Sequence, residues 1–316
     1  MRKIFLFVIL LCWGIVGFTQ DGVNFEHLSF KEALDKAQAE NKLVFVDCYT
    51  SWCGPCRNMT EHIFPQEKVG DYFNSKFVCV KYDMEKGEGP ELGKRFGVRA
   101  YPTFLVLRTD GTLVHKLVGG RDADGIIRGV EEAFDASKAS GAMEASYQAG
   151  ERGKEFLLKY LKTLIRFYDP LETVVAGELM DQLSDKEKMS KDYWFLFTNQ
   201  NLSPAGSNIE KYLLKNYTYF CKSIGKEEVS KEVEKRYVER LMRIFKKEEI
   251  MTERQLKALG REIDALKLPN NGDLQSYVKI ARGETKNLTS LVSVCENEFF
   301  KIKALEVPYI HFYDGS

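Results

Sequence analysis

Short apolar runs and amphipathic segments alternate through the first part of the chain. Ser29 and Glu32 have the spacing of a capping box, and apolar residues follow at positions 30, 33, 34 and 37. We therefore predict a helix that ends near Asn41. The unbroken apolar run at 43–46 directly after it is typical of a strand that is buried on both faces.

Further strands are predicted at 77–82, 103–107 and 113–118. The last two are joined through Asp110-Gly111, which is a strong hairpin signal. Helices are predicted at 53–64, where Pro65 ends the segment, and at 67–73, 90–96 and 126–134. This order of elements predicts an α/β domain with a mixed central sheet flanked by helices.

The second half of the chain has a different pattern. From Met143 onward apolar residues recur at helical spacing, and strand patterns are nearly absent apart from an extended pattern at 307–313. An all-α domain is expected, either as degenerate helical-hairpin repeats or as one irregular helical domain. We interpret the small and polar stretch 136–141 as a linker. The predicted domains are therefore 21–138 and 139–316.

The N-terminal 20 residues differ from the rest. Arg2 and Lys3 precede a long apolar run, and small residues follow at the spacing of a signal-peptidase site. We predict a signal peptide at 1–20 and an exported protein, periplasmic or extracytoplasmic. An uncleaved membrane anchor is the alternative, although the run is short for a span of ~20 residues. Cys12 follows a bulky residue, which fits lipoprotein processing poorly.

Composition excludes some classes of protein. The 46 Lys and Arg residues balance the 46 Asp and Glu residues, and no basic stripe suggests a nucleic-acid partner. Of the seven cysteines, all but Cys12 follow the predicted signal, and they are too sparse for a disulfide scaffold. Their spacing is therefore more informative than their number.

Cys53 and Cys56 form a Cys-x-x-Cys pair at the start of a predicted helix. Unpaired N–H groups and the helix dipole favour a thiolate there, which makes Cys53 the candidate nucleophile. Cys56 follows one turn later, where it can attack a mixed disulfide and release the product. Pro55 suits the first helical turn because the N–H it lacks would have no partner there, and Gly54 leaves the approach to Cys53 open.

The same spacing also occurs in metal sites. Cys48, Cys53 and Cys56 have the spacing of plant-type ferredoxins, with Cys79 as a conceivable fourth ligand, and His62 could complete a zinc site. However, Cys48 and Cys79 continue apolar strand patterns, where a small buried cysteine is an ordinary occupant. With no nicotinamide or flavin motif either, we expect no metal and no cofactor besides the redox-active cysteine pair.

Residues 27–136 resemble the thioredoxin superfamily. The pentapeptide from Trp52 to Cys56 is the thioredoxin-type active-site sequence. Asp47 matches the buried aspartate that helps to take a proton from the second cysteine, and Lys81 matches its buried ammonium partner. The resemblance implies catalytic roles for Cys53, Cys56, Asp47 and Lys81.

Two further matches lie downstream. Tyr101-Pro102 matches the cis-proline segment beside the active-site sulfurs, which adds Pro102 to the catalytic group, and Gly119 matches the glycine near the substrate groove. The sequence alone leaves the isomer of the Tyr101-Pro102 bond open. The resemblance implies substrate contacts at Trp52, Gly54, Pro55, Tyr101 and Gly119.

The match has departures. Glu61 stands where thioredoxins proper have a kinking proline, and Tyr101 before the proline is unusual. The stretch 63–83 is more similar to exported thioredoxin-like proteins and to the periplasmic domain of membrane disulfide reductants. A reductant outside the cytosol must be reduced again after each turnover, and we expect a membrane-embedded thiol carrier as its electron donor.

We therefore expect a thiol–disulfide oxidoreductase that reduces disulfide-containing proteins, because the Gly54-Pro55 dipeptide resembles that of reductants. An isomerase or an oxidase is the alternative direction of the same chemistry. A binding or scaffold protein, in which the helical half captures a partner, is the alternative from another class. The complete set of site residues argues against an inactive scaffold, so we expect the helical half to select substrates.

Overall fold

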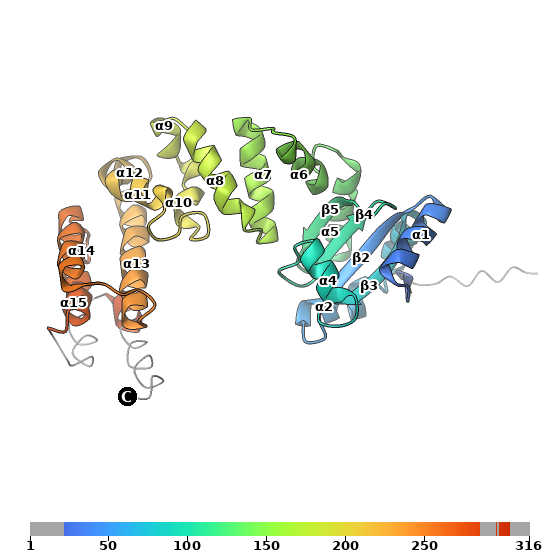
Figure 1. Ribbon diagram of the computed structural model, residues 1–316, viewed down its shortest axis with the longest axis horizontal. Coiled ribbons are helices and arrows are strands. Elements are labelled where there is room, and N and C mark those ends of the chain that lie inside the picture. Colours follow the sequence, from blue (N-terminus) through green and yellow to red (C-terminus); the bar gives the residue numbers. More distant parts are fainter. Residues whose placement is uncertain (1–21, 285–294, 296, 304–316) are drawn as a thin grey trace, which may run out of the picture. The chain divides into compact units, whose positions relative to one another are not determined.

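The computed structural model describes residues 22–284, 295 and 297–303. The predicted signal at 1–20 and the extended segment predicted at 307–313 lie outside the described residues. The chain divides into two compact units (Figure 1). The first runs to Glu151 and includes Lys162–Asp169, and the second comprises Arg152–Leu161 and the chain from Pro170 on. Over the described ranges, no helix is long and apolar enough to cross a membrane.

The first unit contains a mixed sheet that confirms the predicted fold class. Its strands within the described chain have the order β1-β3-β2-β4-β5. Their bounds are β1 (Phe25–Glu26), β2 (Leu43–Tyr49), β3 (Phe77–Asp83), β4 (Thr103–Leu107) and β5 (Leu113–Val118). The first three are mutually parallel, whereas β4 and β5 run antiparallel to their neighbours. The two-residue β1 was not predicted, because a segment this short has no periodicity.

Helices cover both faces of this sheet. They are α1 (Phe30–Glu40), α2 (Gly54–Asn58), the π-helical η1 (Met59–Ile63), α3 (Glu67–Lys76), α4 (Gly89–Arg95), α5 (Ala123–Glu131), the 3₁₀ segment η2 (Glu132–Phe134) and α6 (Ser140–Gln148). Alternation along β2 directs Phe45 toward η1, α3 and α5, and directs Val44 and Val46 toward α1 and α4. The predicted capping box of α1 is present, and Asn41 ends that helix in the left-handed conformation.

Helix α6 corrects the predicted linker and the boundary at 138. It packs against β5, and Ser140, which begins it, is buried with its side chain and backbone hydrogen-bonded to that strand. A Cβ at Gly141 would lie 2.1 Å from the carbonyl oxygen of Leu113, so only glycine permits this approach. Small residues at 139–141 therefore serve close packing and not a flexible linker.

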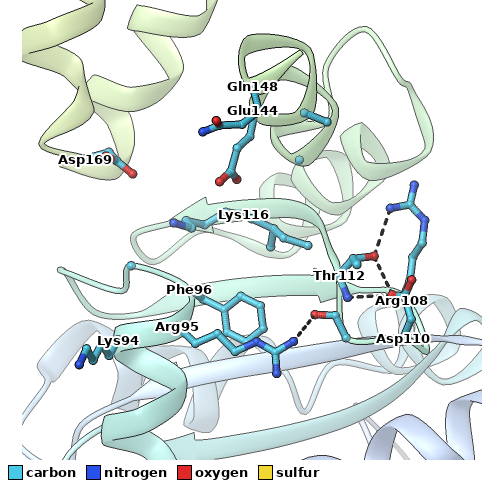
Figure 2. A pocket seen from close by; sticks show the side chains of 15 residues that line it. Lys94, Arg95, Phe96, Arg108, Asp110, Thr112, Lys116, Glu144, Gln148 and Asp169 are labelled. Carbon is cyan, nitrogen blue, oxygen red and sulfur yellow. Dashed lines mark hydrogen bonds between the residues drawn. The ribbon is translucent and has the colours of Figure 1, made fainter. Parts of the chain in front are cut away.

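A cavity of about 890 Å³ lies in the first unit away from the cysteine pair. The β4–β5 turn, α4 and α6 border it, and charges of both signs line it, among them Lys116 and Glu144 (Figure 2). Lys116 is buried, and burial lowers the pKa of its ammonium group.

The described part of the second unit is helical, as predicted. Helix α7 (Lys154–Phe167) is shared between the units. The others are α8 (Leu171–Gln182), α9 (Asp185–Lys188), η3 (Lys191–Tyr193), α10 (Phe195–Thr198), α11 (Asn208–Lys215), α12 (Tyr217–Ser223), α13 (Lys226–Phe245), α14 (Glu253–Leu266) and α15 (Asn271–Ala281).

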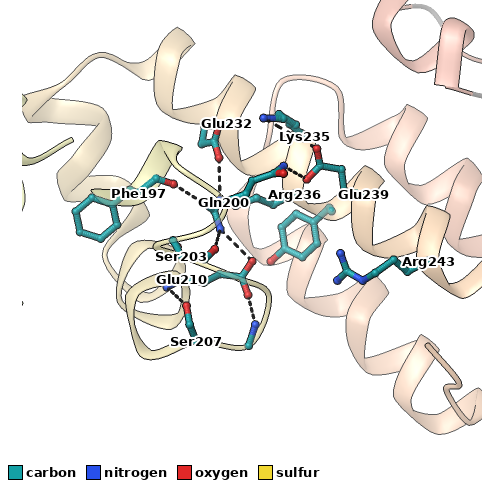
Figure 3. A network of polar contacts seen from close by, with 12 residues as sticks. Phe197, Gln200, Ser203, Ser207, Glu210, Glu232, Lys235, Arg236, Glu239 and Arg243 are labelled. Atoms are coloured by element: carbon teal, nitrogen blue, oxygen red, sulfur yellow. Dashed lines mark hydrogen bonds and ion pairs between the residues drawn. The ribbon is translucent and has the colours of Figure 1, made fainter. Parts of the chain in front are cut away.

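A buried arginine organises this helical unit (Figure 3). The guanidinium of Arg236 on α13 donates to Oε1 of Glu232 at 2.9 Å and to Oε1 of Glu210 at 3.3 Å. It also donates to the carbonyl oxygens of Ser203, at 2.8 Å, and Phe197. Because several acceptors surround it, the charge is compensated inside the unit, and α13 is fixed to the segment 197–210.

Candidate active site

Cys53 caps the N-terminus of α2. Its Sγ accepts a hydrogen bond of 3.1 Å from the backbone N–H of Cys56, and Pro55 lies in the first turn, as predicted. The two sulfurs form a disulfide, with the Cα atoms 5.3 Å apart. In this oxidised form both cysteines are nearly inaccessible, at 4% and 3% exposed. Since N–H groups at the helix end point at Cys53, this sulfur is the one whose thiolate the fold stabilises.

The active-site helix continues from α2 into the π-turn η1, where Glu61 replaces the kinking proline. Met59 in this turn accepts a hydrogen bond at Sδ from the backbone N–H of Arg121, at 3.3 Å. A Cβ at Gly120 would lie 3.6 Å from Cβ of Pro55. The loop after β5 therefore lies against the first turns of the active-site helix.

The loop after β5 also contacts Pro102, the proline that precedes β4. The Tyr101-Pro102 bond is cis, and Pro102 is buried. The backbone N–H of Gly119 donates to the carbonyl oxygen of Pro102 at 2.8 Å. Gly119 has φ of +90°, which favours glycine at this position. The loop after β5 thus contacts Pro102 through Gly119 and Pro55 through Gly120.

Trp52, which precedes Cys53, forms an aromatic pair with the half-buried Tyr101. The side chain of Trp52 is 65% exposed, and its ring contacts that of Tyr101 edge to face, with the centroids 5.9 Å apart. Its Nε1–H donates to Oε1 of Glu85 at 2.9 Å. Glu85 was not predicted, because it lies in a polar turn whose sequence has no pattern that links it to Trp52. The hydrogen bond to Glu85 and the contact with Tyr101 fix the orientation of the Trp52 ring next to the nucleophile.

Asp47 is 1% exposed and pairs in register with Lys81 of the adjacent strand β3. Its Oδ1 has no hydrogen-bond partner among the described residues. Burial raises the pKa of Asp47 to about 7, and the positive charge of Lys81 opposes part of this rise. A carboxyl group with this pKa can accept and return a proton near neutral pH.

Comparison with known proteins agrees with this geometry. The Thioredoxin family pattern matches residues 23–132. Thioredoxin H4 of Arabidopsis thaliana is 41% identical over 91 residues, which are 29% of this chain and 71% of that protein. The chain belongs to the thioredoxin family.

Two other relatives are disulfide isomerases by name. Probable protein disulfide-isomerase A4 of Caenorhabditis elegans is 30% identical over 227 residues, which are 68% of this chain and 34% of that protein. The chain therefore spans about a third of that relative. The solution structure of a candidate disulphide-isomerase from Bacteroides thetaiotaomicron is 50% identical; the match covers 36% of this chain and 95% of that one, with a TM-score of 0.35.

Lys81 departs from the expectation of a buried ammonium partner in this thioredoxin domain. It is half-buried, and its Nζ lies 5.6 Å from the ring centroid of Phe25. Among the described residues no ion pair within 4.0 Å joins it to Asp47. Lys81 is also one of the residues that line a small cavity beside the cysteines. Lys81 thus acts on Asp47 at longer range.

The other cysteines of the thioredoxin domain do not join the pair. Cys48 and Cys79 are free and buried, and they lie in the two core clusters on opposite faces of the sheet. Burial raises the pKa of both thiols above the ordinary range. His62 is exposed, and within the described chain no group of three His, Cys, Asp or Glu residues is placed to hold a metal ion. The only sulfurs that the described residues bring into bonding distance are those of Cys53 and Cys56.

Proposed function

We propose that this protein is a thiol–disulfide oxidoreductase that acts on disulfide-containing proteins through Cys53 and Cys56. The observation that carries the proposal is the position of the Cys53 sulfur. It caps the N-terminus of α2, where it accepts a hydrogen bond from the backbone N–H of Cys56, and it forms a disulfide with the Cys56 sulfur. Membership of the thioredoxin family and the similarity to disulfide isomerases support it.

The reaction is a two-electron exchange between dithiol and disulfide. The thiolate of Cys53 attacks one sulfur of the substrate disulfide, and the other substrate sulfur leaves as a thiolate and takes up a proton. Cys56 then loses its proton, with Asp47 as acceptor, and attacks the Cys53 sulfur. The Cys53–Cys56 disulfide forms, and the substrate leaves as a dithiol. The electrons come from the cysteine pair itself, without a further cofactor.

We propose reduction as the direction in vivo, on the basis of the Gly54-Pro55 dipeptide. Isomerisation is the alternative that the named relatives favour. Three assays on the same protein separate the directions: reduction of insulin, rearrangement of scrambled ribonuclease and oxidation of a reduced peptide. Insulin reduction should be the fastest and should vanish in Cys53→Ser. A protein that rearranges ribonuclease but leaves insulin oxidised would be an isomerase.

We further propose that the protein acts outside the cytosol and receives electrons from a membrane-embedded thiol carrier. The basic and apolar pattern of residues 1–20 supports export. An exported reductant needs such a donor, because its disulfide must be reduced again after each turnover. Cell fractionation locates the protein, and alkylation of cysteines in intact cells reports the redox state of the pair. A cytosolic location would contradict this proposal.

The helical unit is proposed to select substrates, and a binding or scaffold role for the whole chain is the alternative. Its amphipathic helices can present grooves to a partner segment. Replacing Cys56 by Ser should stabilise mixed disulfides on Cys53, and the captured partners identify the substrates. A chain ending at residue 169 that captures the same partners would show that the helical unit does not select them. A scaffold would capture none through Cys53.

A further inference from the structure

Lys116 is a buried lysine at a position of the sheet where an apolar residue is expected. It lies on β5 opposite Leu105 of β4, and the side chain of Leu105 belongs to the apolar core on the sheet face that α1 and α4 cover. Lys116 is only 5% exposed. Burial of an ammonium group is costly unless a partner compensates the charge, so a lysine at this position requires an explanation.

The described part of the chain offers the ammonium group of Lys116 no directly bound anion. Among those residues, its Nζ donates no hydrogen bond and no carboxylate oxygen lies within 4.0 Å of it. Nζ lies 5.3 Å from the ring centroid of Phe167, and a cation–π contact of this kind is weaker than a hydrogen-bonded ion pair. The charges of Asp169 and Glu144 act on the ammonium group from a greater distance.

The side chain of Lys116 lines the cavity of about 890 Å³ that α4, the β4–β5 turn and α6 border (Figure 2). A Cβ at Gly97 would lie 3.7 Å from Nζ of Lys116, so the ammonium group lies beside the end of α4. Sites for small molecules typically measure ~300–1,000 Å³. The cavity is therefore large enough for a small organic ligand.

Charges of opposite sign lie on opposite sides of this cavity (Figure 2). Lys94 and Arg95 of α4 lie on one side, whereas Glu144 of α6 and Asp169 lie on the other, with Lys116 between the two sides. An anion would be repelled by the acidic side, and a cation would be repelled by the basic side. A molecule that carries both charges at separate ends complements the two sides together.

We propose that this cavity binds a small zwitterionic ligand, an amino acid or a short peptide. The carboxylate of the ligand accepts a hydrogen bond from the ammonium group of Lys116, and the ammonium group of the ligand faces Glu144 and Asp169. The third carboxylate of the cavity, that of Asp110, already accepts hydrogen bonds from the backbone N–H and the hydroxyl of Thr112, at 2.8 and 2.7 Å. It therefore belongs to the β4–β5 turn and not to the binding site.

Isothermal titration calorimetry of the full-length protein with triglycine and with free glycine tests the proposal. N-acetylated triglycine lacks the ammonium group, and triglycine amide lacks the carboxylate. Lys116→Met removes the buried charge and keeps an unbranched side chain, whereas Glu144→Gln removes an opposite charge at an exposed position. Glu91→Gln is the matched control, because this exposed glutamate of α4 does not line the cavity.

We expect triglycine to bind, and to bind roughly tenfold more weakly or worse in Lys116→Met, because a hydrogen bond between charged groups is lost. Each blocked peptide should also bind more weakly than triglycine. Glu144→Gln should weaken binding to a smaller extent, since Asp169 remains, and Glu91→Gln should bind as the wild type does. If Lys116→Met does not fold, Glu144→Gln and the blocked peptides decide the matter.

Three results would overturn the proposal. The first is that neither triglycine nor glycine binds at millimolar concentration. The second is that the blocked peptides bind as tightly as triglycine, which would mean that the ligand need not carry both charges. The third is wild-type affinity in both Lys116→Met and Glu144→Gln, which would place the bound peptide elsewhere. Binding of glycine as tight as that of triglycine would support the proposal and identify single amino acids as the ligands.

Discussion

The backbone N–H of Ser140 donates a hydrogen bond to Nδ1 of His115 over 3.1 Å, and both residues are buried. Oγ of Ser140 accepts a second hydrogen bond, of 3.0 Å, from the backbone N–H of Lys116. His115 and Lys116 belong to β5, the edge strand of the sheet. These bonds attach α6 to that edge, so α6 completes the thioredoxin domain in this chain.

A fragment of residues 22–138 lacks α6 and should be less stable than a fragment of residues 22–169, which retains the whole first unit. We expect a loss of roughly 2–4 kcal/mol, because apolar contacts and two buried hydrogen bonds are removed together. Urea denaturation of both fragments measures the difference. Both should reduce insulin wherever they are folded, since the predicted site residues lie before position 138. Equal unfolding midpoints would show that α6 does not contribute.

The buried His115 predicts acid sensitivity. Burial, aided by the positive charges of Arg166 and Arg121, lowers its pKa from 6.5 to about 4. The unfolded chain binds this proton at higher pH than the folded one, so stability should fall as the pH drops from about 6.5 to about 4. The loss should be on the order of 3 kcal/mol. Chemical denaturation between these pH values measures the free energy of unfolding. In His115→Gln this free energy should depend less steeply on pH than in the wild type, and an equally steep dependence would contradict the assignment.

The buried Asp47 predicts a change of stability with pH in the opposite direction. Its folded pKa of about 7 exceeds the ordinary 3.8, so its contribution to stability is largest below pH 4 and is lost as the pH rises to about 7. Asp47→Asn should therefore be more stable than wild type at pH 8, by up to about 4 kcal/mol. The variant should still react at Cys53 but should resolve mixed disulfides more slowly. Unchanged resolution would make Asp47 a structural residue only.

The cysteines of the reduced protein should react at different rates, which depend on their burial and on the helix N-terminus at Cys53. In the reduced protein, iodoacetamide at mild pH should label Cys53 first, because the helix N-terminus lowers its pKa below the free value of ~8.5. Cys48 and Cys79 should stay unlabelled in the native state, since they are buried and their thiol pKa values are raised. Mass spectrometry of the peptides gives the order in which the cysteines are labelled. Faster labelling of Cys56 or Cys48 would refute it.

The Arg236 network predicts that the helical unit can be weakened without a change in the chemistry. Arg236→Met leaves Glu232 and Glu210 without their partner and should destabilise this unit by roughly 3–5 kcal/mol. Arg243→Met, on the same helix but only partly buried, is the control and should cost less. Insulin reduction should be unchanged in both. Loss of insulin reduction in Arg236→Met would mean that the helical unit supports the active site.

The sequence by itself determined the elements that depend on short-range patterns. The capping box of α1, the buried run of β2 and the hairpin turn at Asp110-Gly111 formed where expected, because each follows from neighbouring residues. The Cys53–Cys56 pair was predictable for the same reason, since one helical turn fixes the separation of the two sulfurs.

Only the tertiary structure decided which distant groups meet. Nothing near Trp52 in the sequence indicates Glu85. The family resemblance implied a buried ammonium partner for Asp47, whereas Lys81 is half-buried and forms no ion pair with Asp47 within 4.0 Å among the described residues. The polar stretch that contains Ser140 had the composition of a linker, yet it packs against β5 because its small residues permit close approach. Contacts of this kind depend on packing between segments far apart in the chain, which no local pattern encodes.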